Sequence, residues 1–71
     1  MEDKYEIIIF WSDEDEAFIA DVPELPGCIT HGSSHANALG NTEEAIALWL
    51  ETAREMGRVI PHPKGRRLAF A

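Results

Sequence analysis

The sequence has few basic side chains, one cysteine and no long apolar run. Six Lys and Arg residues stand against 13 Asp and Glu residues among 71, which gives a formal net charge of -7. A chain of this charge repels nucleic-acid phosphates, so direct nucleic-acid binding is disfavoured.

A lone cysteine, Cys28, excludes an intramolecular disulfide and a thiolate cluster. No stretch approaches the roughly 20 apolar residues that cross a bilayer, and no secretory leader is recognisable. We therefore expect a soluble cytoplasmic protein.

The composition nevertheless supports a folded core. Hydrophobic residues make up 45% of the chain and include two Trp, three Phe and one Tyr. A chain this short holds one hydrophobic core at most. We expect a single domain over residues 1–71.

Three segments have the composition of strands. Residues 4–11, KYEIIIFW, form a β-branched and aromatic run that predicts a strand near the middle of a sheet. Residues 16–22 alternate, with Ala17, Ile19 and Asp21 on one face and Phe18, Ala20 and Val22 on the other. The prolines and glycine of residues 23–27 force a bend, after which residues 28–31 predict a third strand.

A helix is predicted from about His35 to Met56. Ser33 or Ser34 can cap its first amides, and Gly57 is suited to its C-terminal stop. Gly40 weakens the first turns and is expected to allow a close approach to the sheet. The residues at three- and four-residue spacing predict one apolar stripe that packs on the sheet: Leu39, Thr42, Ala45, Ile46, Trp49, Leu50, Ala53 and Met56.

Residues 66–71, RRLAFA, follow an extended connector around Pro61 and Pro63 and predict a fourth strand. The predicted fold class is therefore α+β: a three-stranded antiparallel sheet, one long helix on one face, then a fourth strand. Nothing indicates a repeat or a second domain.

No motif supports catalysis or a metal. His31 and His35 lie on either side of a strand-to-helix turn without a third ligand, and the acidic residues 13–16 lack the spacing of a calcium loop. Cys28 opens an apolar strand, where a thiol is usually a small core residue. Trp49 belongs to the core stripe, whereas Trp11 suits either the core or an interface anchor. We expect neither a cofactor nor an enzyme.

The segment from Asp15 to Cys28, DEAFIADVPELPGC, resembles the hallmark of the HicB antitoxin family, an aromatic-centred strand that enters a P-x-L-P-G-C turn. The segments 41–46, 49–51, 57 and 60–61 also look like the family's helix and its exit. The resemblance implies a partial ribonuclease-H-like fold with the element order derived above. A true ribonuclease H needs metal-binding carboxylates from its fourth strand, and residues 66–71 supply none.

The resemblance further implies an antitoxin of a type II toxin–antitoxin pair, which covers the active face of a small basic HicA-type mRNA interferase. Longer family members carry a DNA-binding domain after the fourth strand, and this chain ends at Ala71, so operator binding is not expected. An orphan oligomeric scaffold or ligand-binding module without a toxin is the alternative. In either case we expect a homodimer or a higher homo-oligomer. The residues predicted to bind the toxin are acidic: Asp13, Glu14, Glu16, Asp21, Glu24, Glu43, Glu44 and Glu51.

Overall fold

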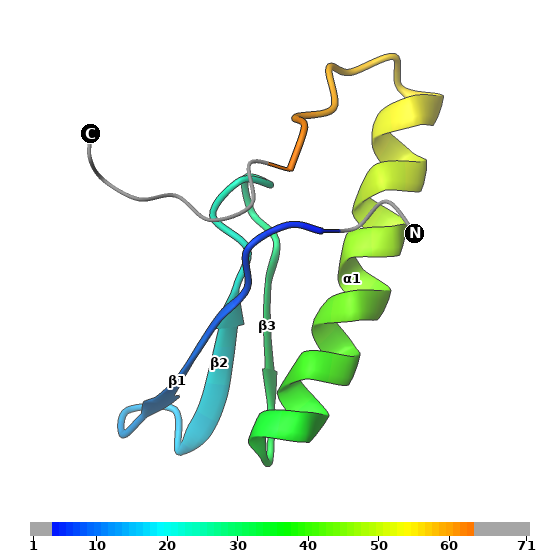
Figure 1. The fold of residues 1–71 in the computed structure, drawn as a ribbon. Coiled ribbons are helices and arrows are strands. Elements are labelled where there is room, and N and C mark those ends of the chain that lie inside the picture. The colour runs from blue at the N-terminus through cyan, green and yellow to red at the C-terminus, as the bar shows by residue number, and fades with distance from the viewer. Residues whose placement is uncertain (1–3, 64–71) are drawn as a thin grey trace, which may run out of the picture.

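The structure, a computed structural model, describes residues 4–63 and consists of two layers, a sheet and one helix (Figure 1). The strands form one antiparallel sheet in the order β1-β2-β3, and the helix packs against one of its faces. This arrangement confirms the predicted α+β class, and the predicted fourth strand lies outside the described residues. The elements are β1 (Ile8–Ser12), β2 (Ala17–Asp21), β3 (Ile29–Gly32) and α1 (His35–Glu55).

The first strand is shorter than predicted, because it starts at Ile8 and not at Lys4. Ile8 pairs with Asp21, which is the last residue of β2, so the residues before Ile8 meet no strand on that side. The chain instead follows the bend after β2, where the backbone N–H of Glu6 donates to Glu24 Oε1 at 3.2 Å. Among residues 4–63, β1 pairs with β2 alone and lies at the sheet edge.

The bend between β2 and β3 is closed by its own backbone. The N–H of Leu25 donates to the carbonyl of Val22 at 3.0 Å, and the N–H of Cys28 donates to the carbonyl of Leu25 at 2.9 Å. Gly27 has a φ of 82°, a value that glycine adopts without strain. The proline-rich segment therefore turns the chain as its composition predicts.

Both helix ends match their predicted caps. Ser34 is the N-cap, and its Oγ accepts from the N–H of Asn37 at 3.0 Å. After the last turn, Gly57 has a φ of 70° and the N–H of Arg58 donates to the carbonyl of Ala53 at 2.9 Å. This pattern is a left-handed C-terminal cap of the kind that favours glycine. The helix does not combine the length and the apolar character that a membrane span needs, and it is the only helix in the described part of the chain.

The core lies between the sheet, the helix and the bend. Part of the predicted helix stripe is wrong: Leu39 is 39% exposed and Met56 is 66% exposed, whereas Ala38, which the prediction omitted, is fully buried. The helix packs mainly on β3 and only slightly on β1, and Met56 lies past its last turn, so both side chains miss the sheet. The buried cluster comprises Tyr5, Val22, Leu25, Cys28, Ile46 and Leu50.

The close approach of helix and sheet occurs at Gly32 and not at Gly40. A Cβ on Gly32 would lie 2.5 Å from the backbone nitrogen of Ala38, whereas a Cβ on Gly40 would meet nothing within 4 Å. The prediction for Gly40 is therefore wrong. The same junction holds a polar contact, because the hydroxyl oxygens of Thr30 and the buried Thr42 lie 2.8 Å apart.

Candidate partner-binding surface

The two faces of the sheet differ in what covers them. Ala20 is fully buried, and the ring centroids of Phe18 and of His35 on α1 lie 4.3 Å apart. Thr30 forms a hydrogen bond with Thr42 of α1. Phe18, Ala20 and Thr30 therefore point toward the helix. Because side chains alternate along a strand, their neighbours point the other way. We call that opposite side the outer face, and its residues are Ile8, Phe10, Ser12, Ala17, Ile19, Asp21, Ile29 and His31.

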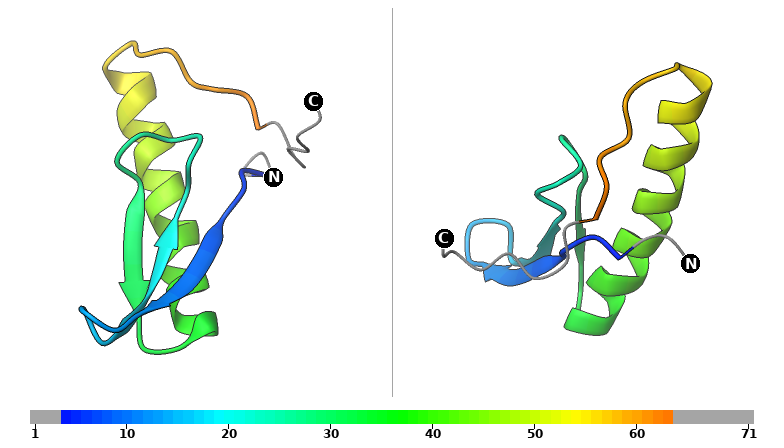
Figure 2. Two further views of the ribbon diagram at one scale, coloured as in Figure 1. Left: turned by 90° about the vertical axis from the view of Figure 1, so that its left-hand side faces the viewer. Right: turned by 45° about the horizontal axis from the view of Figure 1, so that its top comes forward.

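The outer face exposes large apolar side chains. Ile29 is 60% exposed, Phe10 is 48% exposed and Ile8 is 44% exposed, while Ile19 between them is half-buried. Figure 2 shows that the helix lies wholly on the other side of the sheet, and no described element covers this one. An apolar patch at the centre of a small domain's face is typical of a protein interface.

A shallow hollow opens at one end of the outer face. It has a volume of about 330 Å³ and is lined by Asp15, Ala17, Ile19 and His31. The Asp15 carboxylate is held by one hydrogen bond, because the hydroxyl of Ser12 donates to its Oδ2 at 3.1 Å. The hollow thus combines an oriented carboxylate with an apolar wall.

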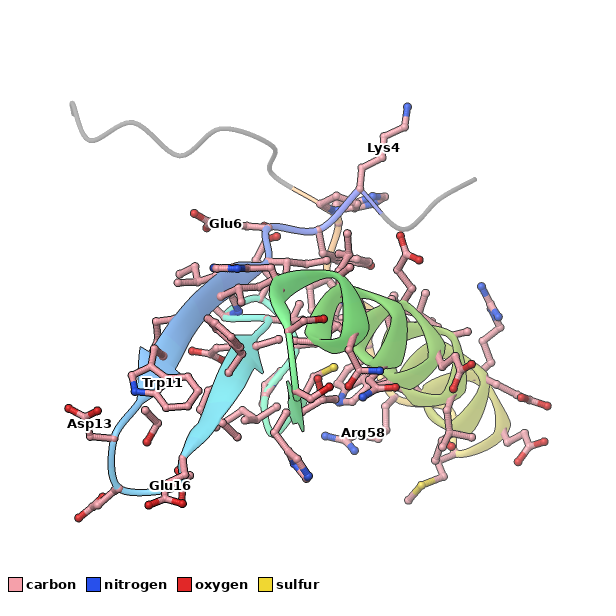
Figure 3. The ribbon with its side chains drawn as sticks, turned by 90° about the horizontal axis from the view of Figure 1, so that it is seen from below. Lys4, Glu6, Trp11, Asp13, Glu16 and Arg58 are labelled. Atoms are coloured by element: carbon pink, nitrogen blue, oxygen red, sulfur yellow. The ribbon has the colours of Figure 1, made fainter. Side chains whose placement is uncertain are left out.

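The charge around this face has one sign. Between Tyr5 and Ala53 the chain contains ten Asp and Glu residues and no Lys or Arg. Figure 3 shows Asp13 and Glu16 in the turn beyond the tip of the sheet and Glu6 toward the opposite end of β1. The outer face is therefore an apolar surface with an acidic border and with Asp21 within it.

The eight acidic residues predicted from the sequence do not form one patch. Asp13, Glu14 and Glu16 share the β1–β2 turn, and Asp21 lies on the outer face itself. Glu24 lies in the following bend and accepts the Glu6 amide. The remaining three, Glu43, Glu44 and Glu51, are exposed on α1 in the other layer. A single flat partner on the outer face would contact the turn and sheet residues, but not those of the helix.

The described cations gather at the other end of the molecule. Lys4 and Arg54 line a hollow of about 450 Å³ together with Tyr5, whose hydroxyl donates to the carbonyl of Pro61. The guanidinium of Arg58 lies 5.5 Å from the centre of the Trp49 ring, a cation–π distance. The described basic groups thus lie around the C-terminal half of α1 and away from the acidic turn.

The residues weighed for metal binding or catalysis lie apart. His31 is on the outer face, whereas His35 stacks on Phe18 on the helix side, so the two imidazoles lie on opposite sides of the sheet. No group of three or more candidate ligands occurs among residues 4–63. Cys28 is buried in the core, as predicted, and burial raises the pKa of its thiol, with repulsion from Asp21 as a smaller cause. A thiol in this state is a poor nucleophile.

The Trp11 side chain is half-exposed and is held by two contacts. It is 49% exposed, its ring packs edge-on against Phe18 with centroids 5.1 Å apart, and its Nε1 donates to Asp13 Oδ1 at 2.7 Å. It therefore ties the acidic turn to the end of the sheet. Trp49 is half-buried against the core, and its Nε1 donates to the carbonyl of Pro26 at 3.0 Å.

Sequence reasoning missed the outer face. The continuous run of β1 predicted a strand near the middle of a sheet and gave no exposed face, but Ile8 and Phe10 are half-exposed. The signal that could have found this face is the alternation of β2, which placed Ile19 on the same side as the charged Asp21. A strand that carries a carboxylate on one face rarely has that face in a closed core.

Comparison with known proteins gives one consistent result. Residues 5–68 match the family described as "HicB_like antitoxin of bacterial toxin-antitoxin system". A UPF0150 protein of Thermoplasma acidophilum is 37% identical over 65 residues, which cover 92% of this chain and 93% of that relative. A UPF0150 protein of Archaeoglobus fulgidus is 37% identical over 49 residues, covering 69% of this chain and 71% of the relative. The matching family is one of antitoxins and not of enzymes. This chain belongs to the HicB-like antitoxin family of bacterial toxin-antitoxin systems.

Proposed function

We propose that the protein neutralises a HicA-type mRNA interferase by binding its active face and excluding RNA. The observation that carries the proposal, beside family membership, is the stretch of ten acidic and no basic side chains between residues 5 and 53. A ribonuclease that holds RNA presents cations to the phosphates, and this surface offers carboxylates to the same cations. Both partners would meet in the cytoplasm, where the RNA substrate is.

The acidic surface is expected to act mainly on the rate of association. Carboxylates around an interface steer a basic partner into contact, and this effect weakens with added salt. In this proposal Asp13, Glu14, Glu16 and Asp21 steer the partner toward the sheet, and Glu24 does so at the bend. Glu43, Glu44 and Glu51 would extend the same negative field from the helix layer.

The direct test is co-expression of this chain with the small basic protein encoded beside it. Stable co-purification, with RNA cleavage by the neighbour lost in the complex and regained after this chain is removed, would support the proposal. No binding, with cleavage untouched by excess antitoxin, would overturn it.

A second experiment tests the role of charge. Glu14→Lys with Asp21→Lys should slow association with the toxin, and the difference from wild type should shrink at high salt. Glu55→Lys is the control for Glu14→Lys alone, because each reverses one charge and Glu55 is an exposed helix residue outside the predicted set. An unchanged association rate in the double variant would show that these two carboxylates do not steer the partner.

A further inference from the structure

The outer face has no occupant among the described residues, and its composition restricts what could cover it. Three large apolar side chains, Ile8, Phe10 and Ile29, are each between 44% and 60% exposed on the same side of the sheet. They lie in two rows across the strands, with Ile8, Asp21 and Ile29 in one row and Phe10, Ile19 and His31 in the next.

We propose that a basic protein docks on this outer face, with Phe10 and Ile29 as its apolar anchors and with one of its arginine or lysine side chains in the hollow at Asp15. The proposal rests on the proposed antitoxin function and identifies the face that the toxin covers. It assigns the main binding energy to apolar side chains that the acidic prediction did not include.

The hollow has the chemistry of a site for a long cationic side chain. Its wall of Ala17 and Ile19 suits an aliphatic stem, and its Asp15 carboxylate suits a charged head group. The Ser12 hydroxyl holds this carboxylate in place, so less freedom is lost when a cation binds. Arginine can in addition form two parallel hydrogen bonds to a carboxylate.

Charge decides between a basic partner and a second copy of this chain. Two outer faces packed together would bring Asp21 and Asp15 of each copy against an equally acidic surface, and no Lys or Arg lies on any of the three strands. His31 is the only other titratable side chain on the face. A basic partner removes this repulsion, because each carboxylate then meets a cation.

The test measures toxin binding by variants that differ in one apolar position. Ile29→Asp and Phe10→Asp should each weaken the complex by at least about tenfold, which corresponds to roughly 1.4 kcal/mol. Leu48→Asp is the matched control, because Leu48 is 64% exposed on the helix and Ile29 is 60% exposed on the outer face. It should leave the dissociation constant unchanged. Asp15→Asn tests the hollow and should speed dissociation.

The outcomes separate this inference from the proposed function. Circular dichroism and urea unfolding first establish that each variant is folded. If the folded outer-face variants bind the toxin as tightly as wild type, the inference is overturned and the antitoxin function stands. If wild type is a dimer by light scattering that Ile29→Asp splits without loss of toxin binding, the face serves self-association and the inference is overturned. If wild type does not bind the toxin at all, the proposed function fails.

Discussion

Glu16 has a φ of 52°, the only positive value at a non-glycine residue in the described chain. The left-handed region is unfavourable for a residue with a Cβ, and glycine or asparagine would fill this turn position with less strain. Residues held in such a conformation often serve a function. Glu16 lies in the β1–β2 turn with Asp13, and both belong to the acidic set predicted to bind the toxin.

This strain can be measured by substitution. Glu16→Gly should raise the free energy of unfolding by about 0.5–1 kcal/mol, because relief of the backbone strain exceeds the added flexibility of the unfolded chain. Glu14→Gly, in the same turn and without a positive φ, should lower it. Urea unfolding of both variants gives the comparison. Equal changes in the two would mean that Glu16 stores no strain.

The paired hydroxyls of Thr30 and Thr42 connect the sheet to the helix. Thr42 donates to the carbonyl of Ala38 at 2.7 Å, which leaves its oxygen to accept from Thr30. Thr42→Val should cost about 1 kcal/mol, because the part-buried Thr30 hydroxyl then loses its acceptor. Thr30→Val together with Thr42→Val should cost less than the sum of the two single changes. Strict additivity in this double-mutant cycle would contradict the pairing.

At the scale of the elements, the two glycines on and after α1 should respond oppositely to the same substitution. Gly40→Ala should stabilise the protein by about 1 kcal/mol, because the added Cβ meets nothing within 4 Å and alanine is the better helix former. Gly57→Ala should destabilise it by about 1 kcal/mol, because the cap requires a φ of 70°. Thermal unfolding of the pair checks the signs, and a loss in Gly40→Ala would contradict the open space above that residue.

The elements were predictable where a local pattern determines them, and less so where a distant partner does. The caps at Ser34 and Gly57 and the alternation of β2 depend on near neighbours, and all three were predicted correctly. The start of β1 at Ile8 depends instead on where β2 ends, which no local pattern reveals. Leu39 has the spacing of a core residue, but the helix packs mainly on β3 and little on β1, and Leu39 is left exposed.

The same distinction holds for the candidate site. The acidic character of the surface was evident from composition, but the separation of its carboxylates into a turn, a sheet face and a helix was not. The outer face was hidden because a run such as IIIFW gives no sign of which side the helix covers. That side is decided by Gly32 and Thr30, which lie on another strand.

At the scale of the whole molecule, the basic groups and the acidic, apolar surface of the sheet lie in different regions. The described basic groups, Lys4, Arg54 and Arg58, lie in or near the C-terminal half of the helix, while the strands and the β1–β2 turn carry carboxylates and no Lys or Arg. Such polarity orients an approaching basic partner before contact. The apolar outer face then supplies the burial that charge alone does not.

Alkaline pH should destabilise the whole fold through two core groups. Burial raises the pKa of the Cys28 thiol and, chiefly by the same cause, that of the Tyr5 phenol, with Glu24 adding to the latter shift. Because both groups ionise more easily in the unfolded chain, stability is fully present below the unfolded pKa values and falls as pH rises through the folded ones. The loss should begin above about pH 8.5 for the thiol and about pH 10 for the phenol.

Urea unfolding between pH 7 and pH 11 measures this loss of stability, and Cys28→Ala should abolish only the part that begins at the lower pH. If wild type and Cys28→Ala lost stability in parallel between pH 8 and pH 10, the thiol would not contribute to the decline.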